Sequence, residues 1–158
     1  MNTFKKHWKL YLLSILGALL IGALGSMATQ SGMAVYDQAA KPPLTPPDWV
    51  FPVVWSVLYT LMGISFGRIF LTDNQNKGQA FKLYTLQLAG NFIWTVLFFG
   101  LHAYGLAFLW LVALWLVIAL MALTFYRMDS VAGLLQIPYL LWVGFAGYLN
   151  LMIALLNR

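Results

Sequence analysis

Long apolar runs separated by short polar breaks dominate the sequence. Five such runs, each about as long as the roughly 20 residues that a helix needs to cross a bilayer, carry almost no charge. They cover residues 10–28, 51–71, 80–100, 104–126 and 131–156. The breaks between them are polar or are marked by Gly and Pro. The pattern predicts an all-α integral membrane protein, a bundle of five transmembrane helices that forms a single domain over residues 1–158.

Composition supports this class. The chain is 62% hydrophobic and 8% charged, with a mean hydropathy of +0.81, whereas soluble domains carry about 25% charged residues. Such a chain lacks the polar residues to cover a surface that faces water. The net charge of +5 reflects basic residues that flank the spans, so we expect membrane lipid as a partner and no nucleic acid.

The basic residues also predict an orientation. If the N-terminus is cytoplasmic, the cytoplasmic side holds seven of them: Lys5, Lys6, Lys9, Arg68, Lys77, Lys82 and Arg127. The other side holds two, Lys41 and Arg158. Because cytoplasmic segments carry an excess of Lys and Arg, we expect a cytoplasmic N-terminus, an external C-terminus and an external connector over residues 29–50.

Small residues raise two questions. The basic N-terminus, its apolar run and Ser26-Met27-Ala28 resemble a signal peptide, but the run is longer than usual, and we favour a retained helix. Ala18, Gly22 and Ser26 recur every fourth residue, and Gly63-xxx-Gly67 has the same spacing. Such faces permit close helix packing. The sequence leaves open whether they pack within one chain or between the chains of a homodimer.

The polar inventory excludes several functions. The sequence has no Glu, its four Asp residues fall in connectors, and His7 and His102 are isolated. No span has an ionisable residue near its centre, which argues against an ion pump or a proton-coupled transporter. We expect no metal site and no cofactor, and we find no residue grouping suited to hydrolysis.

Aromatic and amide side chains are the remaining candidates. Helical spacing places them on one face in each of three spans: Phe51, Trp55 and Tyr59; Gln87, Asn91, Trp94 and Phe98; Trp142, Phe145, Ala146 and Asn150. For each residue alone there is a simpler reading: the aromatic rings form a belt at the membrane interface, and the Asn and Gln side chains form hydrogen bonds between helices. The combination resembles the wall of a pocket for a flat, largely apolar ligand, with mostly apolar walls and a few polar groups.

Prolines mark the first connector and the fifth span. Pro42, Pro46 and Pro47, followed by Trp49, predict a stiff, extended lid over the outer end of the bundle, because proline restricts itself and its predecessor. Pro46-Pro47-Asp48 also resembles a helix start, and both interpretations are compatible. Pro138 predicts either a static kink or a hinge in the fifth helix.

The chain also resembles the tryptophan-rich sensory protein, or translocator protein (peripheral benzodiazepine receptor), family, in its bacterial form. The motifs that carry the resemblance are Lys41-Pro42 through Pro46-Pro47, Trp49-Val50, Trp55, Leu58-Tyr59, Met62-Gly63, Gln87-Leu88-Ala89, Asn91, Trp94, Phe98-Phe99-Gly100, Pro138-Tyr139-Leu140, Trp142, Phe145 and Leu149-Asn150. Together they cover nearly the whole chain after residue 30.

The resemblance implies a bundle, often dimeric, in the bacterial cytoplasmic (inner) membrane. It implies a receptor or sensor that binds porphyrins such as protoporphyrin IX, and isoquinoline carboxamide or benzodiazepine-like ligands, and that regulates tetrapyrrole or stress responses. Carried onto this chain, the ligand site is Tyr36, Phe51, Trp55, Tyr59, Asn91, Trp94, Trp142, Phe145, Ala146 and Leu149. Two alternatives stay open: a light-dependent porphyrin-degrading enzyme that uses Trp55 and Trp142, and a passive transporter of apolar small molecules.

Overall fold

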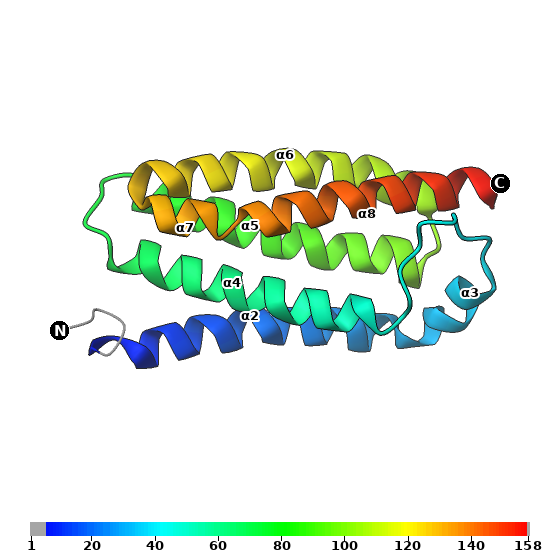
Figure 1. Ribbon diagram of the computed structural model, residues 1–158, viewed down its shortest axis with the longest axis horizontal. Coiled ribbons are helices and arrows are strands. Elements are labelled where there is room, and N and C mark those ends of the chain that lie inside the picture. Colours follow the sequence, from blue (N-terminus) through cyan, green and yellow to red (C-terminus); the bar gives the residue numbers. More distant parts are fainter. Residues whose placement is uncertain (1–5, 158) are drawn as a thin grey trace.

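The computed structural model describes residues 6–157, which contain helices and no strand. Figure 1 shows the long helices lying side by side as an elongated bundle. The elements are α2 (Trp8–Thr29), η1 (Gln30–Gly32), α3 (Met33–Gln38), α4 (Val50–Leu71), α5 (Lys77–Thr95), η2 (Val96–Gly100), α6 (Tyr104–Met128), α7 (Ser130–Leu134) and α8 (Ile137–Leu156). Of the described residues, five helical segments are long and apolar enough to cross a membrane. The predicted fold class is confirmed.

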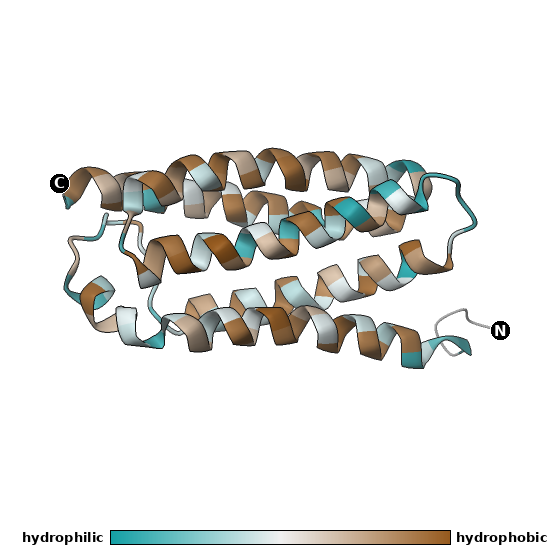
Figure 2. Ribbon diagram, turned by 180° about the vertical axis from the view of Figure 1, so that it is seen from behind, coloured by the Kyte–Doolittle hydropathy of each residue, from teal (hydrophilic) through white to brown (hydrophobic). Residues whose placement is uncertain are grey.

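The distribution of hydropathy agrees with a membrane environment. In Figure 2 apolar colours cover most of the helical surface, and hydrophilic colours gather in the connectors at the two ends. Large apolar side chains such as Leu13 and Leu109 are two-thirds exposed, as expected of residues that face lipid. The predicted orientation stays a prediction. Lys5 and Arg158, which entered the charge count, lie outside the described residues.

The first connector is shorter than predicted. Residues 30–38 of the expected 29–50 connector continue the first span as η1 and α3. Their polar side chains suggested a break, but the Thr29 hydroxyl donates to the Gly25 carbonyl at 2.9 Å and the main chain stays helical. Beyond this point, the proline segment is not fully extended either. Thr45 N donates to the Pro42 carbonyl at 3.0 Å, a turn that Pro43 favours at its second position.

The fifth span is interrupted near its start. Leu135 and Gln136 separate α7 from α8, and Pro138 lies in the first turn of α8. Proline is tolerated there because the first N–H groups of a helix have no partner inside it. This break agrees with both readings of Pro138, and whether it is a static kink or a hinge stays a prediction.

Close packing of α2 against α4 depends on glycine. A Cβ on Gly63 would lie 2.6 Å from the backbone nitrogen of Ile15, and one on Gly67 would lie 2.8 Å from the Tyr11 ring. A Cβ on Gly22 would likewise meet the Tyr59 ring. The small-residue faces predicted from the sequence therefore join helices within one chain.

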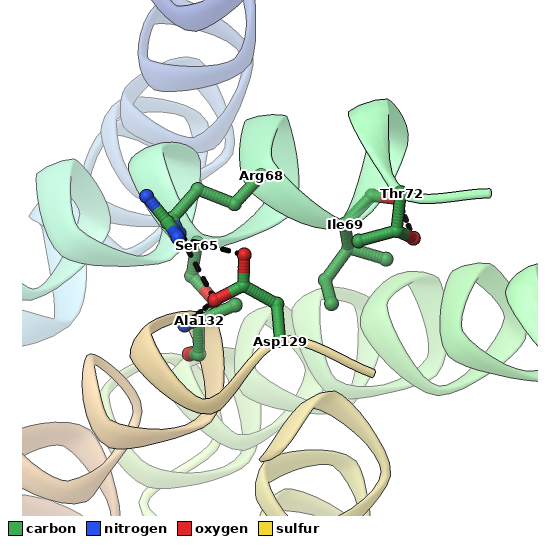
Figure 3. A network of polar contacts seen from close by, with 6 residues as sticks. All are labelled: Ser65, Arg68, Ile69, Thr72, Asp129 and Ala132. Atoms are coloured by element: carbon green, nitrogen blue, oxygen red, sulfur yellow. Dashed lines mark hydrogen bonds and ion pairs between the residues drawn. The ribbon is translucent and has the colours of Figure 1, made fainter. Parts of the chain in front are cut away.

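An ion pair ties α4 to the start of α7 at the end of the bundle opposite the first connector (Figure 3). Arg68 Nη2 lies 2.8 Å from Asp129 Oδ2, and Arg68 Nε donates to Asp129 Oδ1 at 3.1 Å. Asp129 Oδ1 also accepts from Ala132 N at 2.9 Å, and the Ser65 hydroxyl donates to the Ala132 carbonyl at 2.7 Å. Burial alone raises the pKa of Asp129, but the hydrogen bonds from Arg68 and Ala132, with the Arg68 charge, lower it below its ordinary value.

Candidate functional site: an aromatic cavity between the helices

A cavity of about 810 Å³ lies between the helices in the half of the bundle that carries the first connector and the C-terminal end of α8. Its wall combines residues from α2, α4, α5 and α8, with further residues from η1, α3 and η2. Nine of the ten residues predicted for the ligand site line it: Tyr36, Phe51, Trp55, Tyr59, Asn91, Trp94, Trp142, Ala146 and Leu149. Residues that lie far apart in the sequence thus line one cavity.

Phe145 is the tenth predicted residue, and it lies outside this wall. Its ring packs between its neighbours on α8, 5.6 Å from the Trp142 ring and 6.3 Å from the Tyr148 ring. The helical period explains the difference: Trp142, Ala146 and Leu149 form a stripe, and Phe145 lies beside it. Phe145 therefore packs against Trp142, which lines the cavity, but does not line the cavity itself.

The aromatic rings of the wall pack on one another. The Trp55 ring lies 5.6 Å from the Tyr59 ring and 6.5 Å from the Trp94 ring, both tilted. On the other side, the Phe51 and Trp142 rings meet edge to face at 6.0 Å. Because these rings pack against one another, their side chains are already restricted to few rotamers before a ligand binds. The apolar wall is therefore largely preformed.

Hydrogen bonds fix the polar groups of the wall. Asn91 Nδ2 donates to the Tyr59 hydroxyl oxygen at 2.9 Å, which leaves the hydroxyl proton of Tyr59 free to be donated elsewhere. Trp94 Nε1 donates to Asn150 Oδ1 at 3.1 Å, and Asn150 Nδ2 donates to the Tyr104 carbonyl at 2.7 Å. The side-chain amides of Asn91 and Asn150 therefore form hydrogen bonds between helices and also fix the positions of the Tyr59 and Trp94 rings.

Trp142 differs from Trp94 in its hydrogen bonding. Its Nε1 is buried and has no hydrogen-bond partner among the described residues. Together with the Tyr59 hydroxyl, it gives the cavity two free donors. The one charged residue along the described wall is Asp48, near the start of α4. The cavity therefore suits a ligand that is mostly apolar and that carries hydrogen-bond acceptors such as carbonyl oxygens.

A π-helical turn, η2, forms the part of the cavity wall next to α3. η2 ends α5 with a bond from Leu101 N to the Val96 carbonyl, five residues earlier. It turns Phe98 and Phe99 toward α3, where both rings lie within 5.7 Å of the Tyr36 ring. π-Bulges are rare and are frequent at functional sites. Sequence reasoning placed Phe98 on the right face of α5 but did not include it or Phe99 in the site.

Asn150 and the small residues Gly22, Ala23 and Ser26 of α2 also line the cavity and were missing from the predicted site. The signals for both were present in the sequence. Asn150 shares a helical face with Trp142, and the glycine-spaced face of α2 points into the bundle at Gly22.

The residues predicted to form the lid lie in the connector between α3 and α4. Pro42 is buried, Pro46 is half-buried, and Pro47 and Trp49 are exposed. As the structure describes them, none of these four lines the cavity, although Asp48 does. Two hydrogen bonds, both 2.9 Å, tie the connector to the end of α8: Ala40 N donates to Asn157 Oδ1, and Asn157 Nδ2 donates to the Ala40 carbonyl.

Lys41 joins the connector to the cavity wall. Its Nζ lies 4.2 Å from the centre of the Tyr36 ring, within the range of a cation–π interaction, and 3.8 Å from Asp37 Oδ1. Tyr36 is itself buried and lines the cavity. The connector is thereby held at two points, by Lys41 to the cavity wall and by Ala40 to the end of α8.

The fold and the cavity define an α-helical integral membrane protein with an aromatic cavity between its helices. Residues 14–156 match the model of the TspO/MBR family, and the chain belongs to this family. It is 39% identical over 138 residues to Protein CrtK of Rhodobacter capsulatus, covering 86% of this chain and 85% of the relative. It is 38% identical over 144 residues to the Tryptophan-rich protein TspO of Chlorobaculum tepidum, covering 88% and 90%.

A mammalian relative extends the comparison. The Translocator protein of Bos taurus is 35% identical over 133 residues, covering 82% of this chain and 79% of the relative. The predicted family is confirmed, and membership supports a role as a membrane sensor or receptor. It is also consistent with interactions with small molecules and lipid.

Proposed function

We propose that this chain is a membrane receptor whose cavity binds flat, largely apolar molecules, foremost porphyrins of the protoporphyrin IX type. Isoquinoline carboxamide and benzodiazepine-like molecules are further ligands, and occupancy regulates tetrapyrrole or stress responses. The observation that carries the proposal is that Trp55, Trp94 and Trp142 all line one cavity. Its volume of about 810 Å³ lies within the range of roughly 300–1,000 Å³ that is usual for small-molecule pockets.

The contacts of the wall suggest how such a ligand is held. The Trp55, Tyr59 and Trp94 rings offer stacking surfaces, and aromatic pairs gain more than the area that they bury. The free donors on Trp142 and Tyr59 orient acceptor atoms at the edge of the ligand. Because no positive charge lines the described wall, acidic substituents of a porphyrin point toward the connector and not into the bundle.

The test is a titration of the purified protein with protoporphyrin IX in the dark, followed by tryptophan fluorescence. We expect saturable quenching that a Trp55→Phe/Trp142→Phe double variant weakens. The matched control is Trp8→Phe/Trp115→Phe, which also removes two of the seven tryptophans but leaves the cavity wall unchanged. Quenching that does not saturate, or that both double variants weaken equally, would mean nonspecific partitioning and would reject the proposal.

The second candidate function is light-dependent porphyrin breakdown. Trp55 and Trp142 both line the cavity, so each indole would lie beside a bound porphyrin and would be a candidate reactant toward its excited state. Illumination of the same complex separates the two functions. A sensor returns its porphyrin spectrum unchanged, whereas an enzyme bleaches it, and the Trp55→Phe/Trp142→Phe variant should then bind some porphyrin without bleaching it.

Passive transport of apolar molecules is the third candidate. It predicts ligand flux into empty liposomes that contain the protein, and its main sequence support is the hinge reading of Pro138, which lies beside the break before α8. We further propose the bacterial cytoplasmic membrane as the location, with the N-terminus inside. The chain has no cysteine, so single Lys41→Cys and Lys77→Cys variants allow a clean labelling test of the orientation.

A homodimer remains part of the proposal. Because Gly22, Gly63 and Gly67 pack against Tyr59, Ile15 and Tyr11 of their own chain, a dimer has to use other surfaces. Crosslinking in native membranes, compared between the wild type and variants of exposed residues of α2 and α6, tests this.

A further inference from the structure

Four buried polar side chains lie between the floor of the cavity and the Arg68–Asp129 end of the bundle. Tyr84 and Gln87 belong to α5, Gln136 immediately precedes α8, and Tyr139 lies in its first turn. Both helices start at the end opposite the first connector (Figure 1), and all four residues precede the cavity residues of their own helix. We call these four residues the buried polar cluster. None of them is part of the described cavity wall.

Helical spacing and ring contacts bring the members together. Tyr84, Gln87 and Asn91 are three and four residues apart and share one face of α5. The Tyr139 ring lies 6.2 Å from the Trp55 ring, edge to face. The Trp55 ring in turn lies 5.6 Å from the Tyr59 ring, and Gln136 precedes Tyr139 by three residues, about one helical turn. The cluster therefore lies directly below the Tyr59–Asn91 hydrogen bond of the cavity floor.

Burial of the cluster is nearly complete. Gln87 and Gln136 are 0% exposed, Tyr139 is 1% exposed and Tyr84 is 6% exposed. The two hydroxyls and both atoms of each side-chain amide have no hydrogen-bond partner within residues 6–157. Buried polar atoms are normally bonded, and lipid offers no partner inside a bilayer. Six unsatisfied atoms on these four residues therefore point to bound molecules that both donate and accept hydrogen bonds.

The helix break supplies a second, independent observation. Pro138 has no N–H, so it donates no hydrogen bond to the carbonyl four residues earlier, that of Leu134. Ordered water often restores such bonds at breaks in membrane helices. The break adjoins Gln136, a member of the cluster, so free main-chain and side-chain groups occur together.

We propose that the buried polar cluster is a binding site for a small group of ordered water molecules below the ligand cavity. Water fits because every member has an acceptor and a donor, and water supplies both. A divalent metal ion does not fit, because the cluster has no carboxylate, imidazole or thiolate ligand. The site does not depend on which ligand occupies the cavity, and it gives the otherwise apolar bundle a hydrated layer next to the cavity floor.

X-ray radiolysis with mass spectrometry tests the site in the whole protein in nanodiscs, because radicals formed from bound water modify the side chains beside it. The controls are Met121 and Phe125, which are 0% exposed and apolar. Methionine reacts with such radicals more readily than tyrosine. Without bound water at the cluster, Met121 should therefore be modified at least as fast as Tyr84 and Tyr139. We expect the modification rates of Tyr84 and Tyr139 to exceed that of Met121, with the added oxygen taken up slowly from water labelled with ¹⁸O.

A Gln87→Leu/Gln136→Leu variant should lose most of the modification at Tyr139. Gln79→Leu, at an exposed position on the first turn of α5, is the matched control and should leave it unchanged. If Tyr84 and Tyr139 of the wild type stay as unmodified as Met121, the cluster is dry and the proposal is overturned. Equal modification of Tyr139 in wild type and double variant also overturns it. The wild-type comparison decides alone if the double variant does not fold.

Discussion

Replacing Gly63 with alanine tests the packing of α2 on α4. The added methyl would lie 2.6 Å from the backbone nitrogen of Ile15 and closer still to its Cα, and backbone atoms cannot move aside as a side chain does. Overpacking of this kind costs about 1–3 kcal/mol. Alanine also stabilises a helix by about 1 kcal/mol relative to glycine. The net loss in unfolding free energy is therefore about 0–2 kcal/mol.

Gly17→Ala separates the two terms. Gly17 also lies within a membrane helix, but no atom lies within 4 Å of the position of its Cβ, so this variant has the gain in helix propensity without the clash. The difference between the two variants is then the overpacking cost. At about 2–4 °C per kcal/mol for a chain of this size, Gly63→Ala should melt roughly 2–12 °C below Gly17→Ala. The assay is thermal unfolding in detergent. Equal melting temperatures would show that α2 does not pack on Gly63 as described.

Three further predictions concern polar contacts. The pKa of Asp129 is lowered by the fold, so its contribution to stability is present above the ordinary carboxyl pKa of about 4 and is lost as pH falls through the lowered pKa. Asp129→Asn should remove this acid dependence from melting curves, and an unchanged pH profile would contradict the assignment. Trp94→Phe leaves Asn150 Oδ1 without its donor and should reduce the unfolding free energy by about 1 kcal/mol, measured by thermal melting. Asp48→Asn removes the charge from the cavity wall. It should raise the affinity for protoporphyrin IX by up to about fivefold at low salt, since charges a few ångströms apart in water interact by about 1 kcal/mol. The uncharged dimethyl ester of protoporphyrin IX should bind wild type and variant with the same affinity. An equal gain in affinity for both porphyrins would exclude a charge effect.

Much of the fold was accessible from the sequence because the bilayer imposes simple rules. A span needs enough apolar residues and must satisfy its own backbone, so hydropathy located all five helical segments. Helical spacing similarly assembled Trp55, Asn91 and Trp142 as candidates for one wall. These predictions rest on periodicity, which a single sequence displays directly.

The errors arose where contacts between distant residues decide the structure. The helix continues through Gly32, whose missing side chain allows the Phe99 carbonyl to lie against it, and no local pattern signals that contact. The sequence pointed to Pro138 but not to the break at Leu135 and Gln136, which has no Gly or Pro of its own. The exclusion of Phe145 from the wall depends on how far α8 is rotated about its axis, which packing against α6 and α4 decides.

The bonds between Asn157 and Ala40 have a topological consequence. They join the end of α8 to the first connector, so residues 40–157 form a closed ring of four spans. The α2 segment lies outside that ring as a single arm, attached by the connector and docked through its contact with Gly63. A chain cut at the connector is therefore expected to give two pieces that meet where α2 packs against α4 and α5.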